Sequence, residues 1–271
     1  MKGARHERAG GFALIIVLWS LALLSLLISQ IAGSGHQTLQ LAANLRHAAA
    51  LQAVADGAVQ EAGFHLAAGG AAHWRPDGAE RTWREDGVTL RVRLLPEAGL
   101  VNPSVASYDL MTALLQACGA DRPHATQVAQ AMIGWRSAAE TPFGLAAYRA
   151  AGLPYGPPQQ PFESLGELGL VLGMTPPLLD CLRPHLSLYP DTDPDPNLAD
   201  PLVLAAMTAI TGAAPALGQS PPDDTLARVV AVAEDGAGRA RREAVLRLQR
   251  VASEGDAAPG GAPFRVLSWQ R

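Results

Sequence analysis

Lysine is almost absent from this chain of 271 residues, because Lys2 is the only one and arginine supplies nearly all of the positive charge. A phosphate-binding Walker loop requires a lysine, so the chain beyond its N-terminus cannot build one. The formal net charge is -4, whereas a protein that binds nucleic acid usually carries a basic surface. The composition therefore argues against nucleotide hydrolysis and against nucleic-acid binding.

Recognisable catalytic motifs are also lacking. The seven histidines show no His-Glu-x-x-His spacing, and there is no Gly-x-Ser-x-Gly elbow. His124 and His185 lie beside prolines near expected helix ends, where surface residues are commoner than ligands. Glu163 and Glu167 are one helical turn apart, which is typical of a solvated helix face. A membrane-anchored periplasmic enzyme of unknown chemistry stays an alternative, but no residue pattern supports it.

Cysteine is scarce, since Cys118 and Cys181 are the only two. Two cysteines cannot form a disulfide framework, but they can form a single bridge in an oxidising periplasm. Two buried, unpaired thiols are the other interpretation, and the sequence leaves both open.

The chain does have one long apolar run. It starts at Phe12, after a short basic leader, and no Asp, Glu, Lys or Arg follows until Arg46. As a helix, residues 12–31 would span about 30 Å, which is the thickness of a hydrocarbon core. The basic leader favours a cytoplasmic N-terminus.

Three interpretations of this run compete. It can be a signal peptide that is cut at the small residues of Ala32–Gly35, although such apolar regions are usually shorter. It can be a single-pass anchor. It can also be a class III signal that is cut after Gly11, so that the apolar helix stays in the mature protein.

Farther along, the helical pattern becomes amphipathic. One face carries apolar residues at three- and four-residue steps, and the other carries polar residues. The apolar set is Leu51, Val54, Ala58, Ala62 and Leu66, and the polar set is Arg46, Gln52, Asp56 and Gln60. We expect one long helix that packs on a globular part at its end and stops at Gly69–Gly70.

Two stretches predict an antiparallel sheet. Residues 88–94 alternate apolar and polar side chains after a tight turn at Glu85–Gly87, and residues 264–269 alternate again. Residues 246–249 alternate too, although the segment 239–249 also suits a helix.

Between these stretches the pattern is helical. Short helices separated by proline and glycine are expected at 108–118, 126–135, 165–172, 178–182 and 202–210. A sheet that begins before this block and ends after it predicts an α+β fold with a helical insertion.

This order of elements resembles the minor pseudopilin K family of type II secretion, usually called GspK. The residues that carry the resemblance are Gly11–Trp19, Leu100–Ser104, Met132–Arg136, Phe162–Met174 and Pro196–Ala199. They extend over most of the chain, and their order is more specific than any one of them.

The resemblance implies a type IV pilin-like α+β fold, in which a long N-terminal helix packs on an antiparallel sheet with a large inserted all-α domain. The implied parts are a prepilin leader over 1–11, a transmembrane and long helix over 12–68, the first part of the β core over 69–101, the helical insertion over 102–227 and the final strands over 228–271. The prepilin peptidase would cut after Gly11, and the amine of Phe12 would be methylated.

The implied function is structural rather than enzymatic. The chain would cap the tip of the type II secretion pseudopilus and help to initiate its assembly for protein export. The expected partners are the I- and J-type minor pseudopilins, the major pseudopilin, the prepilin peptidase and the inner membrane, with the globular part in the periplasm. No nucleic acid is expected as a partner, and no cofactor is required.

Ile16 is the fifth residue after the expected cleavage site, where the resemblance implies a glutamate in ordinary pilins and major pseudopilins. A carboxylate inside a bilayer is costly unless it is paired, and in the family it meets the amine of the subunit already assembled. A subunit that starts the filament has no such amine to meet. Ile16 therefore fits a tip subunit, or else it belongs simply to an anchor.

The segment 191–200 supplies side-chain oxygens at closely spaced positions, from Asp191, Asp193, Asp195, Asn197 and Asp200. It is not an EF-hand, because Pro196 and Leu202 stand where glycine and glutamate are needed. The resemblance implies calcium in the helical domain, so calcium is a possible ligand here. A solvated, proline-stiffened acidic turn is the alternative.

Gly173 lies in a turn between two expected helices, and this hairpin raises an uptake-type DNA-binding alternative. Helix-hairpin-helix motifs hold phosphates with glycine amides. Here Glu167 and Asp180 flank the hairpin and Arg183 is the only near cation, so we expect weak phosphate affinity.

Overall fold

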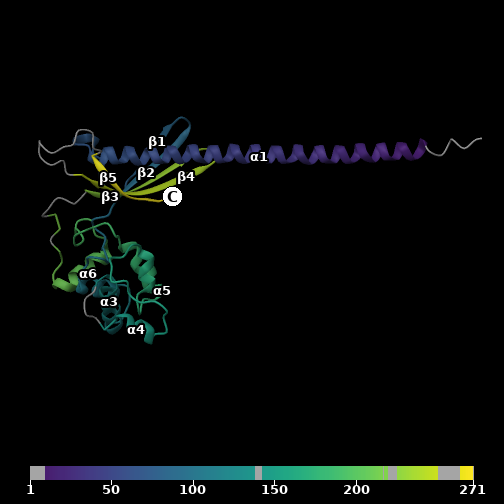
Figure 1. Ribbon diagram of the computed structural model, residues 1–271. Helices are drawn as coiled ribbons and strands as arrows, with labels where there is room; N and C mark the ends of the chain where they lie inside the picture. Colours follow the sequence, from purple (N-terminus) through teal and green to yellow (C-terminus); the bar gives the residue numbers. More distant parts are fainter. Residues whose placement is uncertain (1–9, 138–141, 216, 219–224, 250–262, 271) are drawn as a thin grey trace, which may run out of the picture.

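A single long helix dominates the outline of the protein (Figure 1). The computed structural model describes residues 10–137, 142–215, 217–218, 225–249 and 263–270, without the side chains of 10–12 and 29–38. Helix α1 (Gly10–Ala67) has 58 residues and is about 87 Å long at 1.5 Å per residue. It ends just before Gly69–Gly70, as predicted, and the 3₁₀ turn η1 (Gly70–Ala72) follows.

The sheet has five antiparallel strands, which lie in the order in which they occur in the chain. They are β1 (Glu80–Glu85), β2 (Val88–Pro96), β3 (Leu226–Glu234), β4 (Arg239–Leu248) and β5 (Phe264–Gln270). β2 and β5 confirm the strands predicted from alternation. β4 shows that the segment from 239 onward is a strand and not a helix.

No alternation predicts β3, because this central strand is buried on both faces over most of its length. It begins at Leu226, two residues before the expected start of the final strands. The turn between β1 and β2 is as predicted. Asp86 and Gly87 have φ of 47° and 84°, and two successive positive φ values give the twist of a tight hairpin.

The end of α1 packs on one face of the sheet. Most of the predicted apolar face is buried there, with Val54 only partly covered, in a core made by Leu51, Ala55, Ala58, Val59, Ala62 and Leu66 of α1 and alternate residues of the strands. The alanines on α1 and β3 allow the helix and the sheet to approach closely. Asp56 departs from the prediction of a solvent side, because its carboxylate pairs with Arg242 of β4.

The chain between β2 and β3 forms a second body, called here the helical unit (residues 97–225). Its elements are α2 (Tyr108–Ala117), α3 (Arg122–Arg136), α4 (Leu145–Ala150), η2 (Leu165–Leu170), α5 (Pro176–Leu182), η3 (Arg183–His185) and α6 (Pro201–Thr211). They enclose a core of their own that includes Met111, Leu114, Val128, Met132 and Tyr148. The helical unit lies on the side of the sheet away from α1 (Figure 1).

Two predictions for the helical unit needed adjustment, and one short helix was not predicted. Helix α3 starts earlier than expected, because Asp121 accepts a hydrogen bond from the backbone N–H of His124 and caps it. The segment from Leu165 is a 3₁₀ helix of six residues and not an α-helix. No pattern predicts the short helix α4. The expected cap at Ser107 is confirmed, since its Oγ accepts from the N–H of Leu110.

Candidate assembly interface

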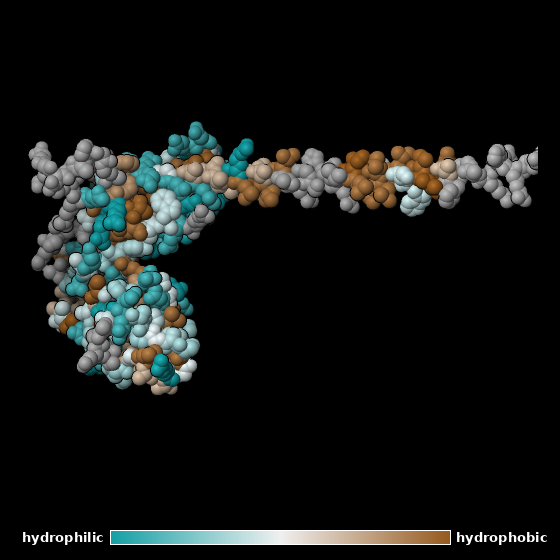
Figure 2. Space-filling view, in the orientation of Figure 1, coloured by the Kyte–Doolittle hydropathy of each residue, from teal (hydrophilic) through white to brown (hydrophobic). Residues whose placement is uncertain are grey.

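The first part of α1 presents apolar side chains to its surroundings. From Leu14 to Ile28, every large apolar side chain is between 50% and 70% exposed. Figure 2 shows these residues as brown patches on the rod, away from the sheet and the helical unit. An apolar surface of this extent marks a place that another protein or lipid covers.

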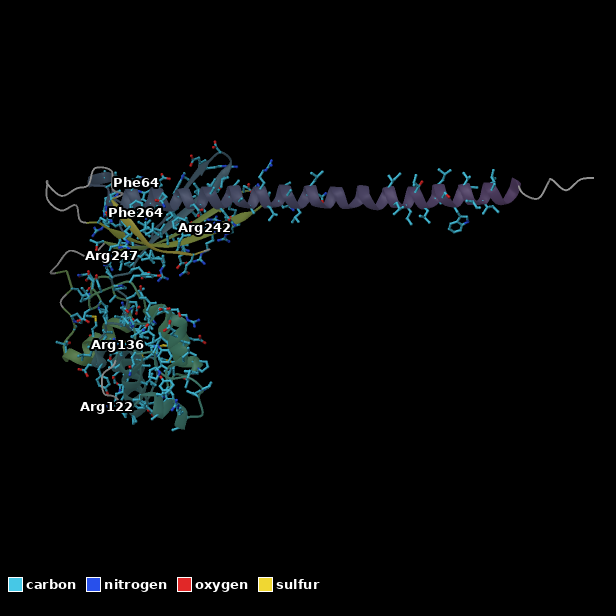
Figure 3. The ribbon with its side chains drawn as sticks, viewed as in Figure 1. Phe64, Arg122, Arg136, Arg242, Arg247 and Phe264 are labelled. Carbon is cyan, nitrogen blue, oxygen red and sulfur yellow. A yellow bond between two sulfur atoms is a disulfide. The ribbon has the colours of Figure 1, made fainter. Side chains whose placement is uncertain are left out.

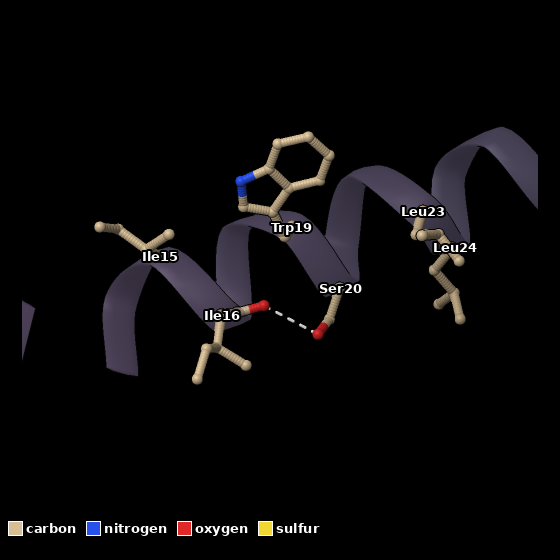
Figure 4. A pocket seen from close by; sticks show the side chains of 6 residues that line it. All are labelled: Ile15, Ile16, Trp19, Ser20, Leu23 and Leu24. Carbon is tan, nitrogen blue, oxygen red and sulfur yellow. Dashed lines mark hydrogen bonds between the residues drawn. The ribbon is translucent and has the colours of Figure 1, made fainter. Parts of the chain in front are cut away.

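Ile16 lies on this apolar surface, in a hollow along the helix that is also lined by Ile15, Trp19, Ser20, Leu23 and Leu24 (Figure 4). The hydroxyl of Ser20 donates to the carbonyl oxygen of Ile16 over 2.8 Å, so the only hydroxyl of the hollow is satisfied within the helix. Trp19 is 70% exposed and forms the wall of the hollow. The hollow is therefore apolar and complementary to another apolar side chain.

The ends of this segment lie outside what the structure describes. The side chain of Phe12 and the whole of the leader before Gly10 are not described, so cleavage after Gly11 and methylation of Phe12 stay predictions. Over the part of the chain that is described, no helix combines the length and the apolar character required for a membrane crossing.

The junction between the sheet and the helical unit is built on Glu97. This residue directly follows β2 and is only 1% exposed. Its carboxylate accepts hydrogen bonds from Arg228 of β3 and from the hydroxyl of Ser187. Burial of a carboxylate requires such partners. A parallel bridge between Val101 and Leu186 lies beside it.

Backbone contacts close the same junction. A Cβ atom at Gly99 would lie 2.2 Å from the carbonyl oxygen of Leu198, so the two segments can meet only because residue 99 is glycine. The N–H of Asp195 donates to the carbonyl of Ala98 over 2.8 Å. Asn102 is buried, and its amide donates to the carbonyl of Pro190 over 2.7 Å. The asparagine of the Leu100–Ser104 motif therefore ties the junction to the loop that follows η3.

Arg247 of β4 adds a third link, seen where the sheet faces the helical unit in Figure 3. It donates from Nη1 to Asp191 over 2.7 Å and from Nη2 to the carbonyl of Tyr189 over 2.6 Å. The hydrogen bond from Arg247 lowers the pKa of Asp191. Together with Glu97 and Gly99, Arg247 holds the helical unit to the sheet at several separate points.

Four of the five predicted calcium residues are engaged with other partners. Asp200 caps α6 by accepting from the N–H groups of Leu202 and Val203, and it also pairs with His185 over 2.6 Å. Asp195 accepts from the N–H of Asn197, while Asn197 accepts from the N–H of Gly218.

Asp191 pairs with Arg247, and Asp193 is exposed. Among the described residues, no three Asp, Glu, His or Cys side chains lie close enough to hold a metal ion. Calcium binding by this segment therefore stays a prediction.

Cys118 and Cys181 are joined in a disulfide, which is the first of the two interpretations that the sequence left open. The bond connects the end of α2 to α5 across 63 residues of chain. The disulfide therefore links two helices of the helical unit that are far apart in the sequence.

The hairpin at Gly173 faces inward. The carbonyl of Gly173 lies 2.8 Å from Nε2 of His124, and a Cβ atom there would lie 3.2 Å from Val128 of α3. Glu167 accepts hydrogen bonds from the N–H groups of Glu163 and Ser164 and so caps η2. These contacts explain Gly173 by packing and Glu167 by capping, without a phosphate ligand.

Comparison with known proteins agrees with this architecture. Residues 92–191 match the family model of type II secretion system (T2SS) protein K. The structure is similar to a chain in the crystal structure of the GspK–GspI–GspJ complex from the type 2 secretion system of enterotoxigenic Escherichia coli. The TM-score is 0.62 at 14% sequence identity, over 84% of this chain and 96% of that chain.

No curated protein sequence matches the chain. The family match begins in β2 and covers most of the helical unit, including the junction at Glu97, Gly99 and Asn102. The resemblance to the protein K family of type II secretion, which the sequence predicted, is thus confirmed over the matched residues 92–191.

Proposed function

We propose that this chain caps the tip of a type II secretion pseudopilus and helps to start its assembly. The observation that carries the proposal is the position of the helical unit. It adds a second folded body on the side of the sheet away from α1 (Figure 1), and the links at Glu97, Gly99 and Arg247 hold it there.

A subunit inside a helical shaft has neighbours around and above its globular part. In the pilin-like arrangement that we propose, α1 lies along the shaft and the sheet packs on its outer end. A body as large as the helical unit would then overlap with the subunit above. At the tip no subunit lies above, so the helical unit meets no obstacle.

Ile16 supports the same position. A buried carboxylate without a partner is costly in hydrocarbon, and the first subunit of a filament has no earlier amine to offer. The described surface around Ile16 is apolar, and its one hydroxyl is already bonded within α1. A subunit with isoleucine here can enter the assembly without a charge partner.

We further propose that the apolar part of α1 holds the protein in the inner membrane before assembly, with the sheet and the helical unit in the periplasm. The exposed side chains from Leu14 to Ile28 support this anchor. The disulfide supports an oxidising compartment for the helical unit. The prepilin peptidase would release the amine of Phe12, which would then be methylated.

The expected partners are the I- and J-type minor pseudopilins, and through them the major pseudopilin. The similar crystal structure is itself a complex of K, I and J proteins, which supports the choice. The exposed apolar hollow on α1 offers a surface for a neighbouring helix.

Gold-labelled antibody against this chain tests the proposal on pseudopili that are sheared from cells. Label at one end of each fibre is expected. Label distributed along the shaft would contradict a tip position, and deletion of the gene should reduce the number of fibres. The mass of the mature N-terminus tests processing, since a chain that starts near Ser34 would exclude it.

A further inference from the structure

Arginine is concentrated on the face of the sheet that α1 does not cover. Cross-strand pairing places two adjacent rows there. In the first row Arg84, Thr89, Glu234 and Arg239 follow one another across β1 to β4, and in the second row Thr82, Arg91, Val232 and Arg241 do so. We call Arg84, Arg91, Arg239 and Arg241 the arginine patch. With strands about 4.8 Å apart, each row is about 15 Å wide.

The arginine patch has more positive charge than its neighbours neutralise. Glu234 is the only carboxylate within the two rows, and it pairs with Arg91. Arg241 reaches Glu243 in the next row over 2.8 Å, but its side chain stays 58% exposed. Arg239 is exposed, and no carboxylate among the described residues pairs with it. Like charges side by side on a sheet are unfavourable, and here they occur in a chain whose net charge is -4.

The arginine patch lies at the end of the sheet that points toward the N-terminal part of α1. The turn after β3 contacts α1 through Asp235, which lies 3.2 Å from Nε2 of His47. The helical unit leaves the sheet from the opposite end of β2 and β3, after Pro96 and before Leu226. The arginine patch is therefore at the level along α1 where neighbouring subunits would carry their own globular parts.

We propose that the arginine patch docks on an acidic surface of the globular part of an adjacent minor pseudopilin. This inference rests on the proposed function for the identity of the neighbour. Lipid headgroups are the less suitable source of negative charge. From Ile28 to His47 the helix rises about 29 Å, whereas the headgroup layer adds only about 5–8 Å to each side of the hydrocarbon core.

The test uses the full-length chain in detergent with the I- and J-type pseudopilins of its own secretion system. Arg239→Glu with Arg241→Glu reverses two exposed charges of the arginine patch. The matched control is Arg122→Glu with Arg149→Glu, two exposed arginines of the helical unit (Arg122 is labelled in Figure 3). Affinity is measured at 50 and 500 mM NaCl, and the thermal midpoint of each variant shows whether the fold is retained.

We expect the patch variant to bind about tenfold more weakly at 50 mM NaCl, and to lose most of this deficit at 500 mM because salt screens the interaction. Arg239→Gln with Arg241→Gln should fall between the patch variant and the wild type. The control should bind like the wild type. Equal affinity of patch variant and wild type would overturn the inference but leave the proposed function intact.

Failure of the wild type to bind either partner at any salt concentration would overturn both. Vesicles that contain phosphatidylglycerol supply the second arm. Little binding is expected, and no difference between patch variant and control. If the patch variant alone lost vesicle binding, the patch would be a lipid site and the inference would be wrong.

Discussion

Arg242 of β4 donates from Nε to the carboxylate of Asp56 on α1, across the interface between the helix and the sheet. The arginine is buried, whereas Asp56 keeps more than one third of its side chain exposed. The guanidinium of Arg242 therefore lies in the core, and the carboxylate of Asp56, at the edge of the helix–sheet interface, neutralises it. Removal of either side chain alone would leave the charge of the other without its partner.

Asp56→Ala should lower the free energy of unfolding by about 2 kcal/mol, because it removes a charge-assisted hydrogen bond and leaves Arg242 buried without its carboxylate. Urea unfolding measures the change. Glu61→Ala is the matched control on the same helix, since Glu61 is exposed and its contact with His65 is 3.8 Å long. The control should change stability by less than about 0.5 kcal/mol. Equal effects would show that Asp56 has no special role.

Two glycines of α1 should respond to alanine in opposite directions. A Cβ atom at Gly63 would lie 2.4 Å from Cζ of Phe264, whereas one at Gly57 would meet nothing within 4 Å. Gly63→Ala should therefore destabilise the protein by about 1–3 kcal/mol through overpacking. Gly57→Ala should stabilise it by about 0.5–1 kcal/mol, because alanine favours the helix. Thermal unfolding of the two variants measures both, and the same sign for both would contradict the packing of β5 on α1.

Replacement of both cysteines by serine should destabilise the helical unit. The disulfide closes a segment of 63 residues, and loss of such a closure costs about 4 kcal/mol through the entropy of the unfolded chain. Urea unfolding of the variant and of the reduced wild type should give similar midpoints, both below that of the oxidised wild type. Identical midpoints for the oxidised and reduced forms would argue against the bond.

The charge of Asp200 should stabilise the fold at neutral pH and lose this effect in acid. Burial alone would raise its pKa, but the hydrogen bonds from His185 and from the N–H groups of Val203 and Leu202 outweigh it, so the pKa lies below the ordinary 3.8. A carboxyl group with a lowered pKa stabilises the fold above its ordinary value, and this contribution is lost as the pH falls through the folded value. The stability difference between the wild type and Asp200→Asn should therefore shrink below about pH 4.

Urea midpoints at pH 6, 4 and 2.5 measure this difference. Asparagine keeps the capping oxygen, so the comparison isolates the charge. A difference that stays constant over this range would show that the charge of Asp200 adds nothing to stability.

Ile16→Glu should impair initiation. In the proposed tip position the new carboxylate would lie in hydrocarbon without an amine to meet. We expect fewer pseudopili per cell and less export, with the amount of the protein unchanged. Ile15→Gln tests polarity at the neighbouring position and should have a smaller effect. Normal fibre numbers with Ile16→Glu would argue against the tip explanation of this residue.

Local features of the sequence predicted much of the fold. The end of α1 at a glycine pair, the alternation of β2, the turn at Asp86–Gly87 and the cap at Ser107 depend on residues close together in the chain. β3 carries no periodic signal, because both of its faces are covered. The sequence could not predict that η2 is a 3₁₀ helix and not an α-helix, because its glycines and leucines suit either helix type.

The contacts that fix the junction and the helix–sheet interface could not be predicted in this way. Glu97 meets Arg228 across 131 residues, and Asp56 meets Arg242 across 186. Asp191, Asp195 and Asp200 are close in sequence and suggested a shared ion, yet each carboxylate turns to a different partner. Only the three-dimensional arrangement decides between these outcomes.

The pairing of β2 with β3 has a consequence for the order of folding. Roughly 130 residues separate the two central strands, and closing a loop of that length in an unstructured chain costs about 4 kcal/mol of entropy. A helical unit that has already collapsed would bring its two ends together and remove most of that cost. The sheet would then form last, so damage to the helical unit should first appear as slow pairing of β2 with β3.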